Sequence, residues 1–201
     1  DEKKLHVIYN GARLKSYASA TLPAFLENQK YLFSIGIINP KKNFHVLLPL
    51  LQNKPDLKLV IAGNDTHDYV QKIKEKALEL GLLQQLHFTG AVNDDLKYTL
   101  YKHCFAFVFP SLSEGFGLPV IEAMLLGKPV FLSKLTCLPE IGGEEAFYWD
   151  NFEAHHMQSI FEKGIQAYEH DSGKVKRIIQ HAASFTWEKA AAAYLELYEN
   201  V

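Results

Sequence analysis

Short apolar runs alternate along the chain with segments whose apolar positions recur every three to four residues. The runs are rich in β-branched and aromatic side chains, which is typical of buried strands. They predict strands at 31–38, 57–63, 86–90, 104–109, 129–132 and 146–149. The longer periodicity predicts helices at 43–51, 69–80, 93–102, 118–126, 153–169, 172–183 and 187–199.

This order of elements predicts an α/β fold. Repeated strand and helix units form a parallel sheet with helices on both faces, as in a Rossmann-like domain. Ligands bind such sheets at the carboxyl ends of the strands. The loops at 36–43, 63–66, 90–93 and 110–118 are all expected at that edge, so we expect the functional site to lie there.

Composition and charge narrow the possible partners. The 201 residues are 48% hydrophobic and 22% charged, which fits one globular domain that buries about 70% of its unfolded surface. A net charge of -2 leaves no basic surplus for nucleic acid. The two cysteines and nine histidines lack the spacing of a metal site, and we therefore expect neither nucleic acid nor a metal as a partner. No apolar run approaches the roughly 20 residues of a transmembrane helix.

One stretch carries the most specific chemistry. Glu114 and Glu122 lie on either side of the turn Gly115-Phe116-Gly117-Leu118, between the strand at 104–109 and the next helix. Such a turn leaves backbone N–H groups at a helix N-terminus that are free to bind a phosphate. Glu122 interrupts an apolar helix face, and a carboxylate there needs donors such as the paired hydroxyls of a sugar.

A second loop places two lysines before the helix at 43–51. Lys41 and Lys42 follow Pro40, at or near the N-terminus of that helix. The helix dipole favours anions at this end, and a bound anion would remove the conflict with the two cations. From these residues alone, two solvated surface lysines stay an open alternative.

The stretch from Glu114 to Val130 resembles the donor-site signature of the retaining glycosyltransferases of family 4 (glycosyl transferases group 1). The typical form is E-G-F-G-L-P-x-x-E-A-M-A-x-G-x-P-V, and this chain has E-G-F-G-L-P-V-I-E-A-M-L-L-G-K-P-V. The loop at 36–43 resembles the G-T-x-x-P-R-K-N of mannosyltransferase-like bacterial members. Ile37 stands where most members have Arg.

The resemblance implies a role for each site residue. Glu114 would hold hydroxyls of the donor sugar, and Glu122 would hold the ribose hydroxyls. Lys42, together with Lys41, would stabilise the leaving diphosphate, which makes Glu114 and Lys42 the expected catalytic residues. Backbone groups near the base, the phosphates and the sugar would come from Gly90, Gly115, Phe116, Gly117 and Leu118. The substrate would be a GDP- or UDP-linked sugar, with no cofactor or metal.

Two later segments extend the resemblance. Residues 138–143 resemble the family's L-P-E-V-x-G, whose glycines are expected to form a turn and whose Glu140 is expected to be a structural hydrogen-bond acceptor. Residues 185–188 resemble F-S/T-W-E at the start of the last helix, which packs towards the partner domain in full-length members. Within that helix, Tyr194, Leu197 and Tyr198 are expected to be core residues, with docking onto the partner domain as the alternative.

Family members have the GT-B architecture, two Rossmann-like domains with the active site between them. The chain opens on a charged stretch without Met, which suggests a fragment of a longer protein. The stretch Ile8-Tyr9-Asn10-Gly11 resembles the V-I-x-N-G at the end of the family's first domain, which implies that residues 1–20 are the end of a preceding acceptor domain and its linker. Residues 21–201 would be the nucleotide-sugar donor-binding domain, inactive without its partner. The implied reaction transfers a hexose, with mannose favoured, to a glycan or lipid-linked acceptor in bacterial lipopolysaccharide, O-antigen or capsule biosynthesis. The whole protein would be cytoplasmic and peripherally associated with the inner face of the membrane.

Three alternatives stay open. The first is another GT-B enzyme, such as a nucleotide-sugar epimerase or a sugar phosphorylase. The second is a non-catalytic nucleotide-sugar-binding module, which Ile37 in place of Arg favours. The third is a purely structural interaction domain, which leaves Glu122 unexplained.

Overall fold

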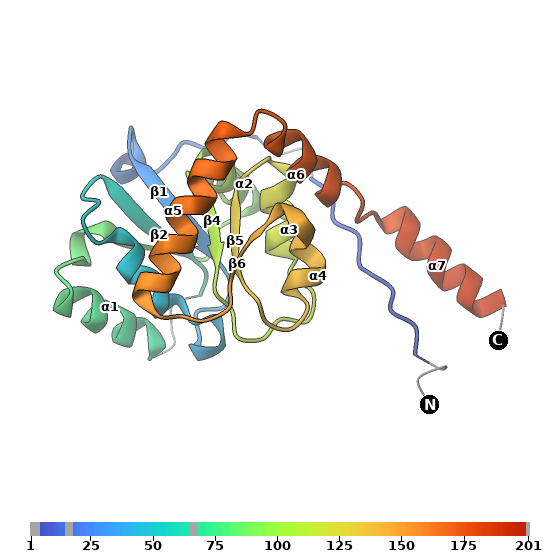
Figure 1. Cartoon of the computed structure of the whole chain (residues 1–201), viewed down its shortest axis with the longest axis horizontal. Helices are drawn as coiled ribbons and strands as arrows, with labels where there is room; N and C mark the ends of the chain where they lie inside the picture. Colours follow the sequence, from blue (N-terminus) through green and yellow to red (C-terminus); the bar gives the residue numbers. More distant parts are fainter. Residues whose placement is uncertain (1–4, 15–17, 65–67, 200–201) are drawn as a thin grey trace.

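A computed structural model of the chain describes residues 5–14, 18–64 and 68–199. Six parallel strands form one sheet in the order β3-β2-β1-β4-β5-β6 (Figure 1). The strands are β1 (Lys30–Ile35), β2 (Leu57–Ala62), β3 (Leu86–Gly90), β4 (Ala106–Phe109), β5 (Val130–Ser133) and β6 (Phe147–Trp149). The strand order reverses between β1 and β4, and ligands bind doubly wound sheets at such a reversal.

Helices cover both faces of the sheet, as the alternation of elements predicts. One layer packs on the face that Phe33 and Phe107 share. It contains α2 (Asp94–His103), α3 (Leu118–Leu125), α4 (Leu138–Gly142) and α6 (Lys174–Ala182). The other layer packs on Leu32 and Val108 and contains η4 (Phe44–Leu51), α1 (Tyr69–Glu79) and α5 (Ala154–His170). The central strands are buried on both faces, which explains why they are mostly apolar runs in the sequence.

The short helical segments depart most from prediction. The helix expected at 43–51 is the 3₁₀ helix η4, which contains Pro49 and follows Asn43 at a φ of 57°. Proline has no backbone N–H to donate, which weakens a regular α-helical ladder here. Helix α4, at 138–142, was not predicted, because five residues are too few to show a helical period. Gly143 then turns the chain at a φ of 56°, as expected.

Helix α7 (Trp187–Glu199) extends away from the body of the molecule (Figure 1). Thr186 caps its N-terminus, since Thr186 Oγ1 accepts a hydrogen bond from Lys189 N at 3.1 Å. The expectation that Tyr194 and Tyr198 are core residues is wrong, because they are 47% and 72% exposed. Only Ala190 of this helix is buried, since its remaining length lies beyond the edge of the sheet.

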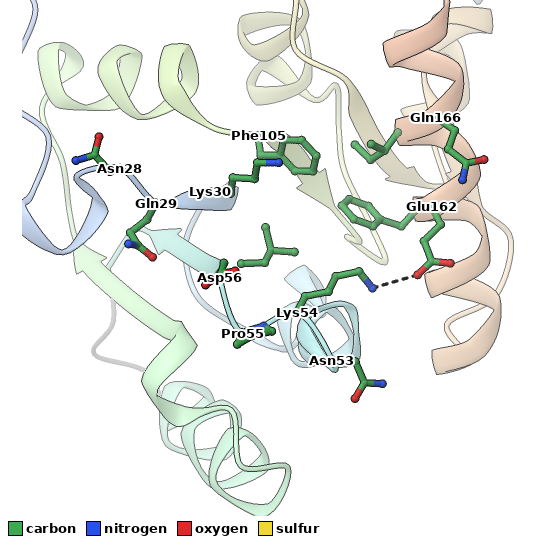
Figure 2. A pocket seen from close by; sticks show the side chains of 13 residues that line it. Asn28, Gln29, Lys30, Asn53, Lys54, Pro55, Asp56, Phe105, Glu162 and Gln166 are labelled. Atoms are coloured by element: carbon green, nitrogen blue, oxygen red, sulfur yellow. Dashed lines mark hydrogen bonds and ion pairs between the residues drawn. The ribbon is translucent and has the colours of Figure 1, made fainter.

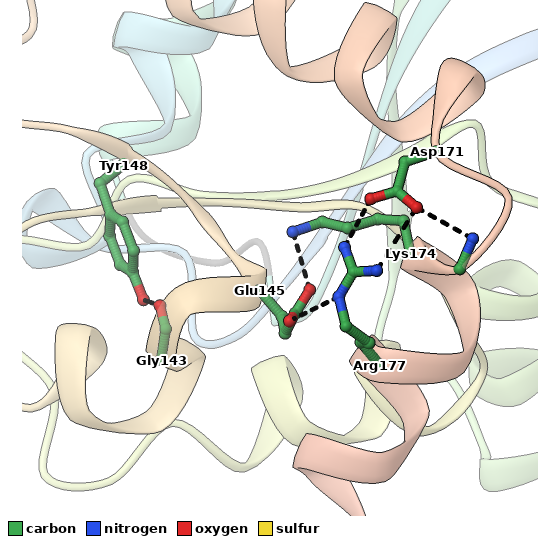
Figure 3. A network of polar contacts seen from close by, with 7 residues as sticks. Gly143, Glu145, Tyr148, Asp171, Lys174 and Arg177 are labelled. Carbon is green, nitrogen blue, oxygen red and sulfur yellow. Dashed lines mark hydrogen bonds and ion pairs between the residues drawn. The ribbon is translucent and has the colours of Figure 1, made fainter.

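A polar network fixes α6 against the turn before β6 (Figure 3). Glu145 pairs with Lys174 Nζ at 2.8 Å and with Arg177 Nε at 3.1 Å, and Arg177 also pairs with Asp171. The pairing outweighs the opposing effect of burial and lowers the pKa of Glu145. Because Lys174 is itself buried, this network anchors the start of α6. Among the helices in the described parts of the chain, none combines the length and apolar character needed to cross a bilayer.

Candidate functional site

The loops that follow β1 and β4 meet at the carboxyl edge of the sheet, where the sequence predicts the site. The backbone links them, since Leu112 N donates a hydrogen bond to Lys41 O at 2.7 Å. Their side chains also meet, with Lys42 Nζ 2.6 Å from Glu114 Oε1. The structure therefore brings together the two residues that are expected to be catalytic.

The Lys42–Glu114 pair is largely shielded from water. The side chains are 16% and 13% exposed, and Lys42 Nζ lies 4.8 Å from the centre of the Phe109 ring. Gly36 makes room for the lysine stem, because a Cβ at that position would lie 2.9 Å from Lys42 Cε. Neighbouring Lys41 is exposed, and its backbone N–H donates to Asn39 Oδ1 at 3.0 Å.

The loop that carries Glu114 is held from behind by the segment after β5. Glu114 N donates to Thr136 Oγ1 at 3.2 Å. Cys137 Sγ donates to the carbonyl oxygens of Glu114 and Phe116, each at 3.3 Å. Burial raises the pKa of the Cys137 thiol, so the thiol remains the donor near neutral pH. These contacts orient the loop and use neither the Glu114 carboxylate nor the N–H groups of Gly115, Phe116 and Gly117.

The turn before α3 presents backbone donors. Gly117, immediately before the helix, has a φ of 100° and provides no side-chain cap. Within the described part of the chain, no group accepts a hydrogen bond from the N–H of Gly115, Phe116 or Gly117. Leu118 and Pro119 form the first helical positions. A helix N-terminus with free donors suits an anionic oxygen, as the sequence predicts.

Glu122 already has protein partners from α2. Its Oε1 accepts hydrogen bonds from Lys97 Nζ at 2.9 Å and Tyr98 OH at 3.3 Å, and its Oε2 accepts one from Tyr101 OH at 3.1 Å. Burial and the Glu122 charge together raise the pKa of Tyr101 well above its ordinary value. Burial opposes the charge on Lys97, but Glu122 outweighs it and raises the pKa of that amine. The carboxylate therefore has a structural role, although two oxygens can accept more than three hydrogen bonds.

Close backbone packing brings the ends of β1, β2 and β3 together. Gly63 N donates to Gly90 O at 2.8 Å, and a Cβ on Gly63 would lie only 1.9 Å from Gly36 O. Gly90 ends β3 with a φ of 69°. This is the edge where the nucleotide base is expected. Ile37 lies at the same edge and is 69% exposed, so the expected Arg is replaced by an exposed apolar side chain.

Sequence reasoning missed several residues that support the site. Lys97 and Tyr101 lie one helical turn apart on α2, and only the packing of α2 on α3 brings them to Glu122. Tyr9, from the N-terminal segment, donates to Glu140 Oε2 at 2.8 Å and lies 6.3 Å from Phe116 between ring centres. Glu140 is thus a hydrogen-bond acceptor, as predicted. In the described residues, no three His, Cys, Asp or Glu side chains gather as a metal site requires.

The chain matches known proteins over most of its length. The family described as glycosyl transferases group 1 matches residues 23–185. Over 180 residues the chain is 32% identical to the serotype-specific mannosyltransferase WbdA of Escherichia coli, covering 83% of this chain and 21% of WbdA. It is 30% identical over 181 residues to the O-antigen chain mannosyltransferase B of Escherichia coli, covering 85% of this chain and 46% of that protein.

A solved structure shares the fold. The Anabaena protein HepE, solved in complex with UDP and glucose, superposes with a TM-score of 0.72 at 24% identity. The match covers 88% of this chain and 50% of HepE. The chain thus spans half or less of these three proteins.

Proposed function

Because this chain belongs to the glycosyl transferases group 1 family, we propose that it is the donor-binding half of a retaining hexosyltransferase. The observation that carries the proposal is the pairing of Lys42 with Glu114, next to the free backbone donors of Gly115, Phe116 and Gly117. This arrangement puts a cation, a carboxylate and anion-binding N–H groups at one edge of the sheet. A nucleoside diphosphate sugar needs these three kinds of group.

Each group has a distinct task in the proposed reaction. The N–H groups before α3 and the Lys42 amine stabilise the negative charge that grows on the diphosphate as the glycosidic bond breaks. Glu114 accepts hydrogen bonds from hydroxyls of the transferred sugar, and Glu122 accepts them from the ribose while α2 holds it in place. Lys41 adds a second positive charge near the phosphates, and Gly90 offers backbone to the base. Gly117 and Leu118 bring backbone groups at the N-terminus of α3 close to the phosphates and the sugar.

The rest of the enzyme is proposed to precede this domain. Residues 1–20 would be the end of the acceptor domain and the linker, and residues 21–201 the donor domain. The described N-terminal segment packs at the start of α7, where Ala12 N donates to Phe185 O at 3.0 Å. Trp187, Tyr194 and Tyr198 are exposed on that helix and offer an apolar surface to a preceding domain.

The relatives' names guide the choice of substrate. WbdA and mannosyltransferase B are named as mannosyltransferases, and the latter acts on the O-antigen chain. HepE was solved with UDP and glucose. We therefore propose transfer of a hexose, with mannose favoured, to a glycan or lipid-linked acceptor in O-antigen or lipopolysaccharide synthesis. The whole protein would work in the cytoplasm, peripherally bound to the membrane.

Calorimetric titration of the chain with GDP, UDP and ADP in EDTA tests this proposal. We expect one nucleotide to bind selectively, and Glu114→Ala and Lys42→Ala to change the binding of its sugar conjugate. Absence of binding by all three nucleotides, both here and in the protein that includes the preceding domain, would contradict the proposal. The second candidate is a non-catalytic nucleotide-sugar-binding module, which the exposed Ile37 favours. It predicts donor binding with no sugar transfer in the longer protein.

A further inference from the structure

A cavity in the described chain lies at the opposite edge of the sheet from the proposed donor site. It has a volume of about 690 Å³ and opens where β1, β2 and β4 begin (Figure 2). Lys30, the first residue of β1, lines it, whereas Gly36 beyond the other end of β1 contacts Lys42. At roughly 3.3 Å per residue, the two places are about 20 Å apart. The cavity is therefore separate from the site described above.

The floor of the cavity is apolar and built from both the sheet and α5. Leu57 opens β2, Phe105 precedes β4, and Phe161 and Ile165 come from α5. Phe161 is buried, while Phe105 and Ile165 are partly accessible. The cavity's volume falls in the range of about 300–1,000 Å³ that small-molecule sites usually have. An apolar floor of this kind suits the C–H face of a sugar ring.

The rim carries charges that cancel. Lys30 and Lys54 are balanced by Asp56 and Glu162. Lys54 Nζ lies 3.1 Å from Glu162 Oε1, and Lys30 Nζ lies 5.1 Å from the centre of the Phe105 ring (Figure 2). The cavity thus has no surplus of positive charge with which to hold a diphosphate. A neutral ligand fits this balance better than a nucleotide.

The rim also presents four amide side chains: Asn28, Gln29, Asn53 and Gln166. Within the described part of the chain, none of these amides makes a side-chain hydrogen bond to another group that the structure records. Each amide offers donors and an acceptor in one plane. Each hydroxyl on a sugar ring can both donate and accept a hydrogen bond. Two adjacent hydroxyls can therefore bind the N–H and the C=O of one such amide.

We propose that this cavity binds a hexose unit of a neutral glycan, apart from the donor site. The apolar floor would face the sugar ring, and the rim amides with Asp56 and Glu162 would hydrogen-bond its hydroxyls. A glycan bound here would stay close to the domain while the enzyme transfers sugar to the end of that glycan. The choice of mannose as the probe rests on the proposed function, but the chemistry of the cavity does not.

Saturation-transfer NMR of the chain with α-linked mannotriose, and in parallel with maltotriose, tests the proposal. We expect saturation transfer to at least one trisaccharide, undiminished by excess GDP. Gln166→Ala and Gln29→Ala should each weaken binding by about fivefold, as for one lost hydrogen bond. Glu169→Ala, on α5 outside the cavity, is the control and should bind as the parent chain does.

Three results would overturn the proposal. They are no saturation transfer to either trisaccharide, displacement of the sugar by GDP, or equal binding in all of the variants. The first or third result in a chain that still binds one nucleotide would reject the glycan site and leave the donor site standing. A chain that binds a trisaccharide but no nucleotide would reject the donor site and leave the glycan site standing.

Discussion

Lys42 Nζ and Glu114 Oε1 lie 2.6 Å apart although 72 residues separate them in the chain. Each of the two expected catalytic residues is thus held in place by the other, inside a site that is mostly shielded from water. A nucleotide sugar would replace this contact with two others, phosphate on the amine and hydroxyls on the carboxylate. In the proposed function, the pair would hold both side chains in place before the donor binds.

Replacing Lys42 should affect both stability and binding. Lys42→Ala leaves Glu114 without its cation, so we expect the free energy of unfolding to fall by about 1–3 kcal/mol. We also expect the affinity for the preferred nucleoside diphosphate to fall about tenfold, because a charge-assisted contact to phosphate is lost. Urea unfolding and calorimetry measure the two effects.

Lys41→Ala is the matched control for stability, because Lys41 is exposed and unfolding should change by less than about 0.5 kcal/mol. If Lys42→Ala binds the diphosphate as tightly as the parent chain, the amine does not contact phosphate. In that case the pair with Glu114 is purely structural.

Glu122 and its α2 partners allow the structural and binding roles of this carboxylate to be separated. Tyr101→Phe removes one of its three donors and should cost about 1 kcal/mol of stability, with nucleotide affinity unchanged. Glu122→Ala removes the shared acceptor of Lys97, Tyr98 and Tyr101. Lys97 keeps its pair with Asp94, but the two phenols lose this acceptor, so we expect a loss of about 2–3 kcal/mol in stability. If Glu122 holds the ribose, its loss also weakens nucleotide binding by about 1–3 kcal/mol. Equal affinities in both variants would leave Glu122 with a structural role alone.

The sheet could be predicted from sequence because its strands are buried on both faces. Leu32 and Phe33 face opposite helical layers, and both are fully buried, so the strand is apolar at consecutive positions from Tyr31 to Phe33. Local periodicity could not predict that α7 leaves the body of the molecule. Tyr194 and Tyr198 have the spacing of a core-facing helix, but they are 47% and 72% exposed.

The site could be predicted only in part, for a similar reason. Glu114 and Lys42 belong to local motifs, and strand order brings their loops to one edge. The donors on Glu122 depend on how α2 packs against α3, and the Lys97 and Tyr101 side chains give no local signal of that contact. The position of Tyr9 beside Glu140 depends on the path of a segment 131 residues away in sequence.

The glycine at the end of β2 should tolerate no side chain. Gly63 has a φ of 144°, and a Cβ there would lie 1.9 Å from Gly36 O, a backbone atom that cannot move alone. We expect Gly63→Ala to lower the free energy of unfolding by more than about 2 kcal/mol. Gly81 also has a positive φ, 70°, but nothing lies within 4 Å of its Cβ position. Gly81→Ala should therefore cost only about 1 kcal/mol, and equal losses in urea unfolding would contradict the steric argument.

The two cysteines should react at different rates. Cys104 is buried, and burial raises its pKa to about 12, so a thiol reagent should modify it only after unfolding. Cys137 is partly accessible beside Glu114 and Phe116 and should react first, but more slowly than a free cysteine because its pKa is raised. Nucleotide binding should slow its reaction further. Mass spectrometry of labelled chains with and without nucleotide measures both rates, and faster labelling of Cys104 would contradict the buried position.

The contact between Tyr9 and Glu140 can be followed by the titration of the phenol. The hydrogen bond that Tyr9 donates to Glu140 raises the pKa of Tyr9, with smaller effects from burial and from the Glu140 charge. A raised pKa means that the fold favours the protonated phenol. The contact therefore contributes to stability below the ordinary pKa of 10.0 and is lost as the pH rises through the higher value. Glu140→Gln removes the charge, so we expect the pKa of Tyr9 to fall towards 10.0.

Site-specific NMR of ¹³C-labelled tyrosine measures this pKa, and the signal that disappears in Tyr9→Phe identifies the residue among the ten tyrosines. Glu144→Gln is the control, because this exposed carboxylate lies near the same turn and should leave the titration unchanged. An unchanged Tyr9 titration in Glu140→Gln would mean that the N-terminal segment does not rest on the 138–143 turn in solution. A lowered pKa would place Tyr9, and with it the N-terminal segment, against Glu140 in solution, beside the ring of Phe116. In the proposed arrangement of domains, a preceding domain would then be connected to the proposed donor site through this contact.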